Sequence, residues 1–149
     1  MTTYVDTSAL LKRYVDEPDS DRANELLAAD PALVTARHTV VEVRRNLAQI
    51  LGPTDATATR AAFAADLGSL ALIELDAATC ELAATVGEQT GVRTLDALHL
   101  GAALRLGTAV TFLTFDVRQA QAARSLGYRD HFALALGADP VRAGFDPHL

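Results

Sequence analysis

The chain has 149 residues, of which 50% are hydrophobic and 5% aromatic; this fits one domain with a packed core and excludes an intrinsically disordered protein. Its formal net charge is −6, from 19 acidic and 13 basic residues, so it lacks the basic balance of a protein that coats nucleic acid. An enzyme with an acidic metal site can still bind RNA through a local arginine face, and every basic residue except Lys12 is arginine.

The apolar segments are too short to span a membrane. The longest uncharged run, 106–115, is about half of the ~20 residues that a transmembrane helix needs. The first residues carry neither a basic region nor a long apolar stretch, so we expect no signal peptide. Cys80 is the single cysteine, which excludes an intramolecular disulfide, and we expect it to be a small core residue rather than a nucleophile. These features predict a soluble, cytoplasmic protein with no membrane contact.

Short apolar runs alternate with segments of helical periodicity. In chain order they predict a strand at 4–5, helices at 8–14 and 20–29, a strand at 33–35, helices at 38–51 and 55–67, a strand at 71–75, helices at 77–90 and from 94 to about 107, a strand at 110–114, and a helix from 116 to about 127. Thr54, Asp76 and Thr94 are expected N-caps, and Gly91 is expected to end a helix. The remainder, 128–149, can hold one more short strand and a polar tail. This alternation predicts an α/β fold in one domain over 1–149, with a parallel sheet covered by helices on both faces.

Four acidic residues fall where such a fold places its active site. Asp6 follows the first strand and Asp116 follows the strand at 110–114, so both lie at the carboxyl ends of strands, where open parallel sheets bind ligands. Asp96 lies in the first turn of its helix, and Glu42 lies about one turn into the helix after the second strand. The fold can bring these four positions to one edge of the sheet.

Each acid also has a purely structural interpretation. An aspartate between a strand and a helix is usually an N-cap, which stabilises by roughly 0.3–1 kcal/mol, and Glu42 could be an ordinary exposed helix residue. The apolar neighbours of Asp6 and Asp96 predict partial burial, and few bases lie near them in the sequence. A buried carboxylate needs a partner, so a bound cation is a natural solution.

The motifs around these acids resemble those of PIN-domain nucleases, most closely the VapC-type toxins of bacterial toxin–antitoxin pairs. They are Val-Asp-Thr-Ser-Ala-Leu-Leu-Lys-Arg-Tyr at 5–14, Glu42 in a helix near one third of the chain, Leu-Asp-Ala-Leu-His-Leu at 95–100, and Thr-Phe-Asp at 114–116. The resemblance runs from residue 3 to about 128, with all four acidic positions in order. Two residues depart from the pattern: Ala36 stands where a serine is common, and Asp19 where a glycine is common.

The resemblance implies a three-layer α/β/α sandwich with a parallel sheet of about five strands. It also implies endonucleolytic, metal-dependent cleavage of RNA, leaving a 5′-phosphate and a 3′-hydroxyl, with Mg²⁺ or Mn²⁺ as the cofactor. The expected partners are the RNA substrate, a cognate antitoxin protein and a second copy of the chain. The implied site residues are the acids Asp6, Glu42, Asp96 and Asp116, the supporting residues Ser8 and Thr114, and the acid and serine after the first helix, Glu17 and Ser20.

Within this scheme, Asp6 and Asp96 are expected to hold the main ion, with Asp116 helping directly or through water. Glu42 is expected to orient the attacking water or to complete a second ion site. Oxygen ligands suit Mg²⁺, so His99, three residues after Asp96, is expected to pack or hydrogen-bond near the site rather than to bind that ion. The arginines nearest these motifs are candidate phosphate ligands: Arg13, Arg44, Arg93 and Arg118.

Other functions remain open on sequence alone. A structure-specific DNA nuclease could use the same scaffold, and a PIN fold without catalysis could serve as a binding module, although no acid is missing here. A phosphate-accepting receiver domain also clusters acids in an α/β fold. It normally needs a lysine at the end of a late strand, whereas Lys12 follows the first strand, so we set this class aside.

Overall fold

A computed structural model describes residues 2–128 of the chain. Four strands form one sheet in the order β3-β2-β1-β4. Their bounds are β1 Thr2–Val5, β2 Ala32–Ala36, β3 Ala71–Ile73 and β4 Thr111–Leu113. All neighbouring strands are parallel, which confirms the predicted parallel α/β fold. The further short strand that we expected within 128–149 lies outside the described residues, which end at residue 128.

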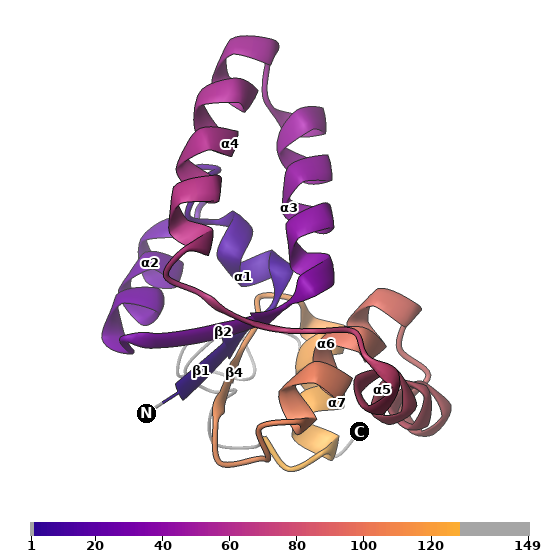
Figure 1. Cartoon of the computed structure of the whole chain (residues 1–149). Coiled ribbons are helices and arrows are strands. Elements are labelled where there is room, and N and C mark those ends of the chain that lie inside the picture. Colours follow the sequence, from indigo (N-terminus) through magenta and orange to yellow (C-terminus); the bar gives the residue numbers. More distant parts are fainter. Residues whose placement is uncertain (1, 129–149) are drawn as a thin grey trace.

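Helices cover both faces of the sheet, as predicted (Figure 1). One face carries α1 Thr7–Leu11, α2 Ser20–Ala29, α3 Arg37–Ile50 and α4 Pro53–Leu67. The other carries α5 Ala77–Thr90, α6 Thr94–Leu104 and α7 Val117–Ser125. The α3–α4 pair extends beyond the sheet as an arm (Figure 1). No helix within residues 2–128 is both long and apolar enough to cross a membrane.

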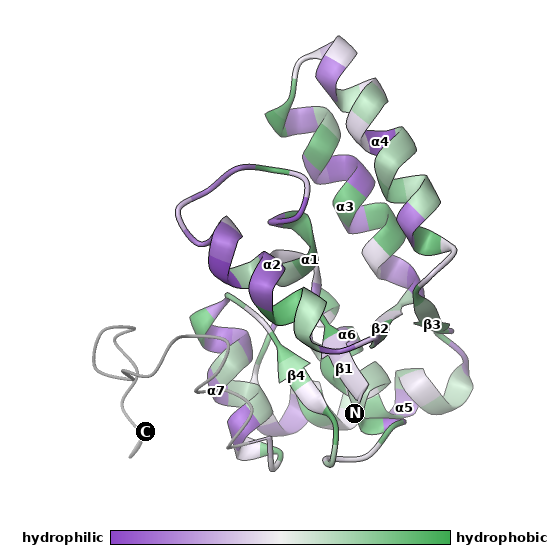
Figure 2. Ribbon diagram, turned by 90° about the vertical axis from the view of Figure 1, so that its left-hand side faces the viewer, coloured by the Kyte–Doolittle hydropathy of each residue, from purple (hydrophilic) through white to green (hydrophobic). Residues whose placement is uncertain are grey.

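The two faces bury separate hydrophobic cores because successive strand residues point to opposite sides. Tyr4 and Phe112 stack at 5.3 Å between ring centroids in the core under α5, α6 and α7. Val5 and Leu113, the next residues of β1 and β4, belong to the core under α1–α4. Hydrophobic and hydrophilic residues alternate along the helices (Figure 2), and the buried apolar residues of α1–α4 and of α5–α7 belong to these two cores. The sheet thus holds the ends of β1 and β4 rigidly between two packed layers.

Local capping fixes several helix starts. The carboxylates of Asp6, Asp76 and Asp116 each accept a hydrogen bond from the backbone N–H three residues on, at 3.1, 2.9 and 2.9 Å. Gly91 ends α5 in the left-handed region, with φ 72°, where glycine is favoured. Two of the acids predicted for the active site therefore also start helices, so the capping interpretation and the site interpretation apply to the same residues.

Three local predictions were wrong. Thr54 and Thr94 lie inside their helices, because Gly52 and Arg93 occupy the N-cap positions. Pro53 fits the first helical position, where its missing N–H has no intrahelical partner to lose. Cys80 is exposed rather than buried, since α5 turns the adjacent Thr79 toward the core and Cys80 to solvent.

Candidate active site

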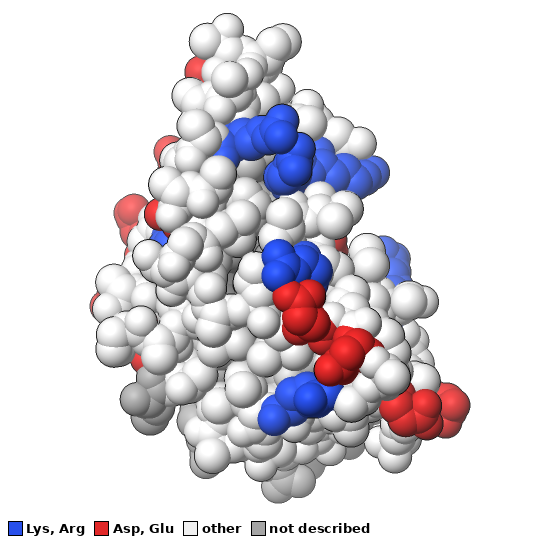
Figure 3. Space-filling model, viewed as in Figure 1, with Lys and Arg blue, Asp and Glu red and all other residues white. Residues whose placement is uncertain are grey.

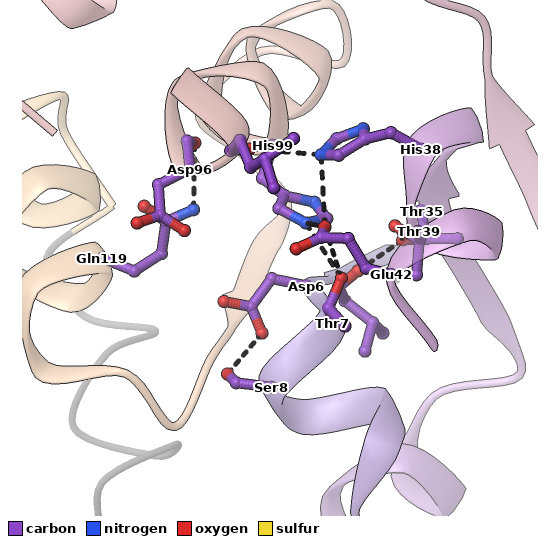
Figure 4. A network of polar contacts seen from close by, with 12 residues as sticks. Asp6, Thr7, Ser8, Thr35, His38, Thr39, Glu42, Asp96, His99 and Gln119 are labelled. Carbon is purple, nitrogen blue, oxygen red and sulfur yellow. Dashed lines mark hydrogen bonds and ion pairs between the residues drawn. The ribbon is translucent and has the colours of Figure 1, made fainter. Parts of the chain in front are cut away.

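The four predicted acids come from four different parts of the fold. Asp6 follows β1 and caps α1, and Asp116 caps α7 shortly after β4. Glu42 lies on α3 and Asp96 in the first turn of α6. Figure 4 shows the side chains of Asp6, Glu42 and Asp96 in one region of the molecule. This region lies at the carboxyl edge of β1 and β4, the ligand-binding edge of an open parallel sheet.

Asp6 is the most enclosed of the four, with 3% of its surface exposed. One carboxylate oxygen accepts hydrogen bonds from Ser8 Oγ at 2.7 Å and from Ala9 N at 3.1 Å. The other accepts one from Thr114 Oγ1. The structure thus places both predicted supporting residues against Asp6. Burial raises the pKa of Asp6 even though the charge of His99 and these hydrogen bonds lower it.

The negative charges of the other two aspartates act on the carboxyl group of Asp96. It is half-buried, and burial raises the pKa of its carboxyl, with the negative charges of Asp116 and then Asp6 raising it further. Asp116 is exposed and holds the N-terminus of α7 through the backbone N–H of Gln119. Asp116 and Asp6 therefore both repel the Asp96 carboxylate, and a divalent cation between them would relieve that repulsion.

The donor set of these aspartates fits magnesium. Carboxylate oxygen is the ligand that Mg²⁺ prefers, and the ion usually keeps several of its own waters. Carboxylates that do not all converge can therefore share one ion, some of them through water. Within residues 2–128, Asp6, Asp96 and Asp116 do not form a group whose ligand atoms all lie within 4.8 Å of one another.

Glu42 faces a different set of partners. Its Oε1 lies 2.8 Å from His99 Nε2, 2.8 Å from Thr7 Oγ1, which donates to it, and 3.5 Å from His38 Nε2. Burial would raise the pKa of Glu42, but the hydrogen bond and charge of His99, together with Thr7 and His38, bring it below its ordinary value. Glu42 is thus held as an anion at the side of the aspartate group.

His99 links Glu42 to the core beneath it. It is 2% exposed, and its Nδ1 lies 2.8 Å from the Tyr4 hydroxyl. This agrees with the expectation that it hydrogen-bonds near the site. Sequence reasoning did not find Thr7, Tyr4 or His38 as neighbours of Glu42. One signal was available for His38, because its position four residues before Glu42 on a helix puts the two on one face.

Gln119 was also missed, and it supports Asp96 from α7. Its side chain is fully buried, and its Nε2 donates a hydrogen bond to the backbone carbonyl of Asp96 at 3.0 Å. Its Oε1 is one of three buried side-chain atoms within residues 2–128 that have no hydrogen-bond partner, together with His38 Nδ1 and Thr79 Oγ1. Gln119 therefore ties the start of α6 to α7, the two elements that carry Asp96 and Asp116.

The predicted basic residues fall into different surroundings. Arg13 lies 3.8 Å from Asp66, so a carboxylate already faces it. Arg44 lines a groove of about 490 Å³ on the α3–α4 arm together with Arg45 and Arg60. Figure 3 shows basic side chains gathered over this arm. Arg93 and Arg118 line a second, polar hollow of about 510 Å³.

The remaining motif residues have structural roles. Glu17 pairs with Lys12 at 2.7 Å, and Ser20 bonds the backbone of Val15 and Glu17 in the turn before α2. Ala36, where the family pattern has a serine, is the N-cap of α3 and provides no side-chain hydrogen bond to it.

The sequence matches known proteins over most of its length. The family model for the PIN domain matches residues 3–125. Ribonuclease VapC46 of Mycobacterium tuberculosis is 36% identical over 125 residues, which are 83% of this chain and 92% of that protein. Ribonuclease VapC47 of the same species is 32% identical over 130 residues, covering 84% and 92%.

Solved structures share the fold at lower identity. VapC20 of Mycobacterium tuberculosis, a toxin that cleaves the sarcin–ricin loop, superposes with a TM-score of 0.62 and 21% identity over 80% of this chain and 94% of that one. A toxin–antitoxin complex from Klebsiella pneumoniae gives 0.63 and 16%, covering 78% and 88%. FitAcB from Neisseria gonorrhoeae gives 0.65 and 16%, covering 82% and 93%. On the family model and the two curated relatives, this chain belongs to the PIN-domain family, in the group of VapC proteins.

Proposed function

We propose that this protein is a metal-dependent endoribonuclease and the toxin of a toxin–antitoxin pair. Membership of the PIN family and the relatives named as VapC ribonucleases support the reaction class. The observation that carries the proposal is the aspartate group. Burial makes Asp6 and Asp96 costly to ionise, and the charges of Asp116 and Asp6 add to that cost at Asp96. Carboxylates kept together against their repulsion indicate a site built for a cation.

Asp6, Asp96 and Asp116 would hold the ion, with Mg²⁺ as the proposed cofactor and Mn²⁺ as its substitute. When bound, such an ion neutralises phosphate charge and lowers the pKa of a coordinated water. Ser8 and Thr114 keep the Asp6 carboxylate in one orientation through their hydroxyl groups. Gln119 fixes the backbone at Asp96 in the same way. These contacts preorganise the aspartates before substrate arrives.

Glu42 would orient the attacking water and accept its proton. The contacts from His99, Thr7 and His38 all reach Oε1, so Oε2 is the oxygen that would face the attacking water. Because these contacts lower the pKa of Glu42, its carboxylate is ionised at neutral pH and can accept a hydrogen bond from that water. The same contacts fix its rotamer, so the water would be held in one place.

The two arginine-lined hollows would bind the RNA backbone. Arg44, with Arg45 and Arg60, lies on one and Arg93, with Arg118, on the other. Arginine forms bidentate hydrogen bonds with phosphate, so these residues are the proposed ligands for the RNA backbone. Arg13 is the weaker candidate because Asp66 lies beside it.

The proposed protein partners are an antitoxin and a second copy of the chain, and the proposed place of action is the cytoplasm, where cellular RNA is. Several structural neighbours were solved as toxin–antitoxin complexes, among them the one from Klebsiella pneumoniae. Large apolar side chains stand exposed, including Val41 at 67% and Leu95 at 48%. Such residues are normally covered in an assembly when they form a patch.

The test is cleavage of a mixed RNA pool by the purified protein with Mg²⁺, with Mn²⁺ and with EDTA. Asp96→Asn is the inactive variant, and Asp21→Asn, an exposed first-turn aspartate on α2, is the matched control. We expect cleavage that needs metal, disappears in Asp96→Asn and survives in Asp21→Asn. Cleavage by Asp96→Asn at the wild-type rate would overturn the assignment.

Parallel lanes separate this function from the two open alternatives. Cleavage of flap DNA but not of RNA would identify a structure-specific DNA nuclease. No cleavage of either, from folded protein that binds no Mg²⁺ by calorimetry, would identify a binding module. The acids of the site are all present, which favours the nuclease.

A further inference from the structure

A second set of metal-ligating atoms lies beside the aspartates. It consists of His38, Glu42 and His99, each of which offers one ligand atom within 4.8 Å of those of the other two. Two of the separations are 2.8 Å, from Glu42 to His99, and 3.5 Å, from Glu42 to His38. Among residues 2–128, this is the group of three or more His, Cys, Asp or Glu residues whose ligand atoms all lie this close to one another.

The spacing suits a small four-coordinate ion. Ligands bound tetrahedrally at roughly 2.0–2.1 Å stand about 3.3 Å from one another, so the two separations from Glu42 Oε1 need only small shifts. Two imidazole nitrogens and one carboxylate oxygen are the protein ligands of many open zinc sites. Magnesium seldom takes imidazole, so this donor set selects against the ion proposed for the aspartates.

The surroundings also fit a metal site. The Tyr4 hydroxyl, 2.8 Å from His99 Nδ1, can accept that N–H and leave the lone pair of Nε2 directed at the ion. Thr7 Oγ1 lies 3.1 Å from His99 Nε2, where it could hydrogen-bond a water that completes the tetrahedron. His38 would give up its present hydrogen bond to the Leu95 carbonyl, 3.1 Å away, to bind the ion through Nε2.

Burial makes the group well defined while leaving an entrance. The side chains of His38 and His99 are 7% and 2% exposed, whereas that of Glu42 is 21% exposed. The two rings lie 4.1 Å apart between centroids, which limits their rotation. An ion can therefore enter past Glu42 and meet two imidazoles that are held close together.

We propose that His38, Glu42 and His99 form a second metal site that takes a transition-metal dication of the Zn²⁺ class. This site differs from the aspartate site in its ligands, its preferred ion and its position. It shares Glu42 with the nuclease reaction, so Zn²⁺ bound there inhibits RNA cleavage. This consequence rests on the proposed function. The ion neutralises Glu42 and lowers its ability to accept a proton from water.

Inhibition alone is a poor test, because Zn²⁺ could also displace Mg²⁺ from the aspartates. Binding of Co²⁺ is a better one, since four-coordinate Co²⁺ bound to imidazole absorbs visible light much more strongly than octahedral Co²⁺ bound to oxygen. The full-length protein is stripped with EDTA, dialysed and titrated with Co²⁺. The variants are His38→Gln and Glu42→Gln, and Asp96→Asn is the matched control that alters only the aspartate site. Thermal melts show that each variant is folded.

We expect a strong visible band that saturates at one equivalent in the wild type and in Asp96→Asn. In His38→Gln the apparent affinity for Co²⁺ should fall at least tenfold. Glu42→Gln should show the same loss, and it provides the test if His38→Gln does not fold. A wild-type spectrum without this band, a band that persists in both folded variants, or a band lost in Asp96→Asn would overturn the proposal. RNA cleavage with Mg²⁺ in zinc-free buffer is measured separately, so failure of the nuclease function and failure of this site give different results.

Discussion

The imidazole of His99 on α6 lies 2.8 Å from the carboxylate of Glu42 on α3, and this contact joins helices from opposite faces of the sheet. Tyr4 on the central strand stands behind the ring, 2.8 Å from its other nitrogen. The three residues form a continuous hydrogen-bonded path through the middle of the molecule. The position of Glu42 therefore depends on packing around His99 as well as on α3.

Replacing His99 tests this dependence. His99→Ala removes one of the two partners that lie 2.8 Å from Glu42 Oε1 and leaves the Tyr4 hydroxyl without this partner, so we expect cleavage to slow by about 10–100-fold, as for other residues that orient a catalytic group. His99→Gln keeps one donor and should recover part of the rate. The measurement is single-turnover RNA cleavage at saturating Mg²⁺ in zinc-free buffer. A folded His99→Ala protein with the wild-type rate would show that His99 does not position Glu42.

Removing one charge from the aspartate group should stabilise the metal-free protein. The raised pKa of Asp96 means that its ionised form disfavours the folded state, so Asp96→Asn relieves that cost. Because Asp96 is half-exposed, we expect a gain of at most about 1 kcal/mol in the free energy of unfolding. Urea denaturation in EDTA measures it. Added Mg²⁺ should stabilise the wild type by mass action and leave Asp96→Asn unchanged. Equal stabilisation of both proteins would place the ion elsewhere.

The stability of the protein should respond to the titration of His38. Burial, and then the charge of His99, lower the pKa of His38 from 6.5 to about 4. Between these values the unfolded chain binds a proton that the folded protein does not, so folding stability falls as the pH drops through this window. The loss attributable to His38 has a slope of at most about 1.4 kcal/mol per pH unit.

The variant His38→Gln is the reference, because Asp6 and Asp96 titrate in both proteins and only the titration of His38 and its effect on Glu42 are removed. The free energy of unfolding of each protein is measured in EDTA at several pH values. Below pH 6.5 the wild-type value should fall faster than that of His38→Gln, so the two curves converge or cross. Two curves that stay parallel down to pH 4 would show that His38 titrates normally in the folded state.

The close contact of α5 and α6 depends on Gly101. A Cβ added there would lie 2.6 Å from the backbone nitrogen of Ala83, so the helices would have to separate. We expect Gly101→Ala to destabilise the protein by about 1–3 kcal/mol. Gly87 on the facing helix is the matched control, because its added Cβ would meet only Ala97 at 3.8 Å. Gly87→Ala should be neutral or stabilise by up to about 1 kcal/mol. Thermal unfolding compares them, and equal effects would rule out the steric explanation.

Local chemistry explains what the sequence could predict. The bounds of α5 were predicted correctly because Asp76 caps one end and Gly91 ends the other, and both signals act within a few residues. The positions of Asp6 and Asp116 at strand ends follow from the same kind of pattern. The contact of Ser8 and Thr114 with Asp6 was suggested by the family resemblance and has its physical basis in the pairing of β1 with β4.

What the sequence could not show depends on how the helices pack. His38 and His99 lie on helices from opposite faces of the sheet, and no periodicity predicts that their rings lie 4.1 Å apart. The exposure of Cys80 depends on the rotation of α5 by a single residue. The orientation of Glu42 toward His99 rather than toward the aspartates likewise follows from the approach of α6 to α3.

The parallel pairing of β1 with β4 has a consequence for when the enzyme becomes active during synthesis. Thr3 pairs with Thr111, so β1 gains this neighbour only after β2, β3 and β4 have all been synthesised. Asp96, Asp116 and the Thr114 hydroxyl that holds Asp6 also arrive late. A nascent chain that ends before β4 lacks part of the acidic group and cannot complete the edge of the sheet that bears it. The aspartate site of this RNA-degrading family member therefore cannot form on a nascent chain until β4 and the start of α7 have been made.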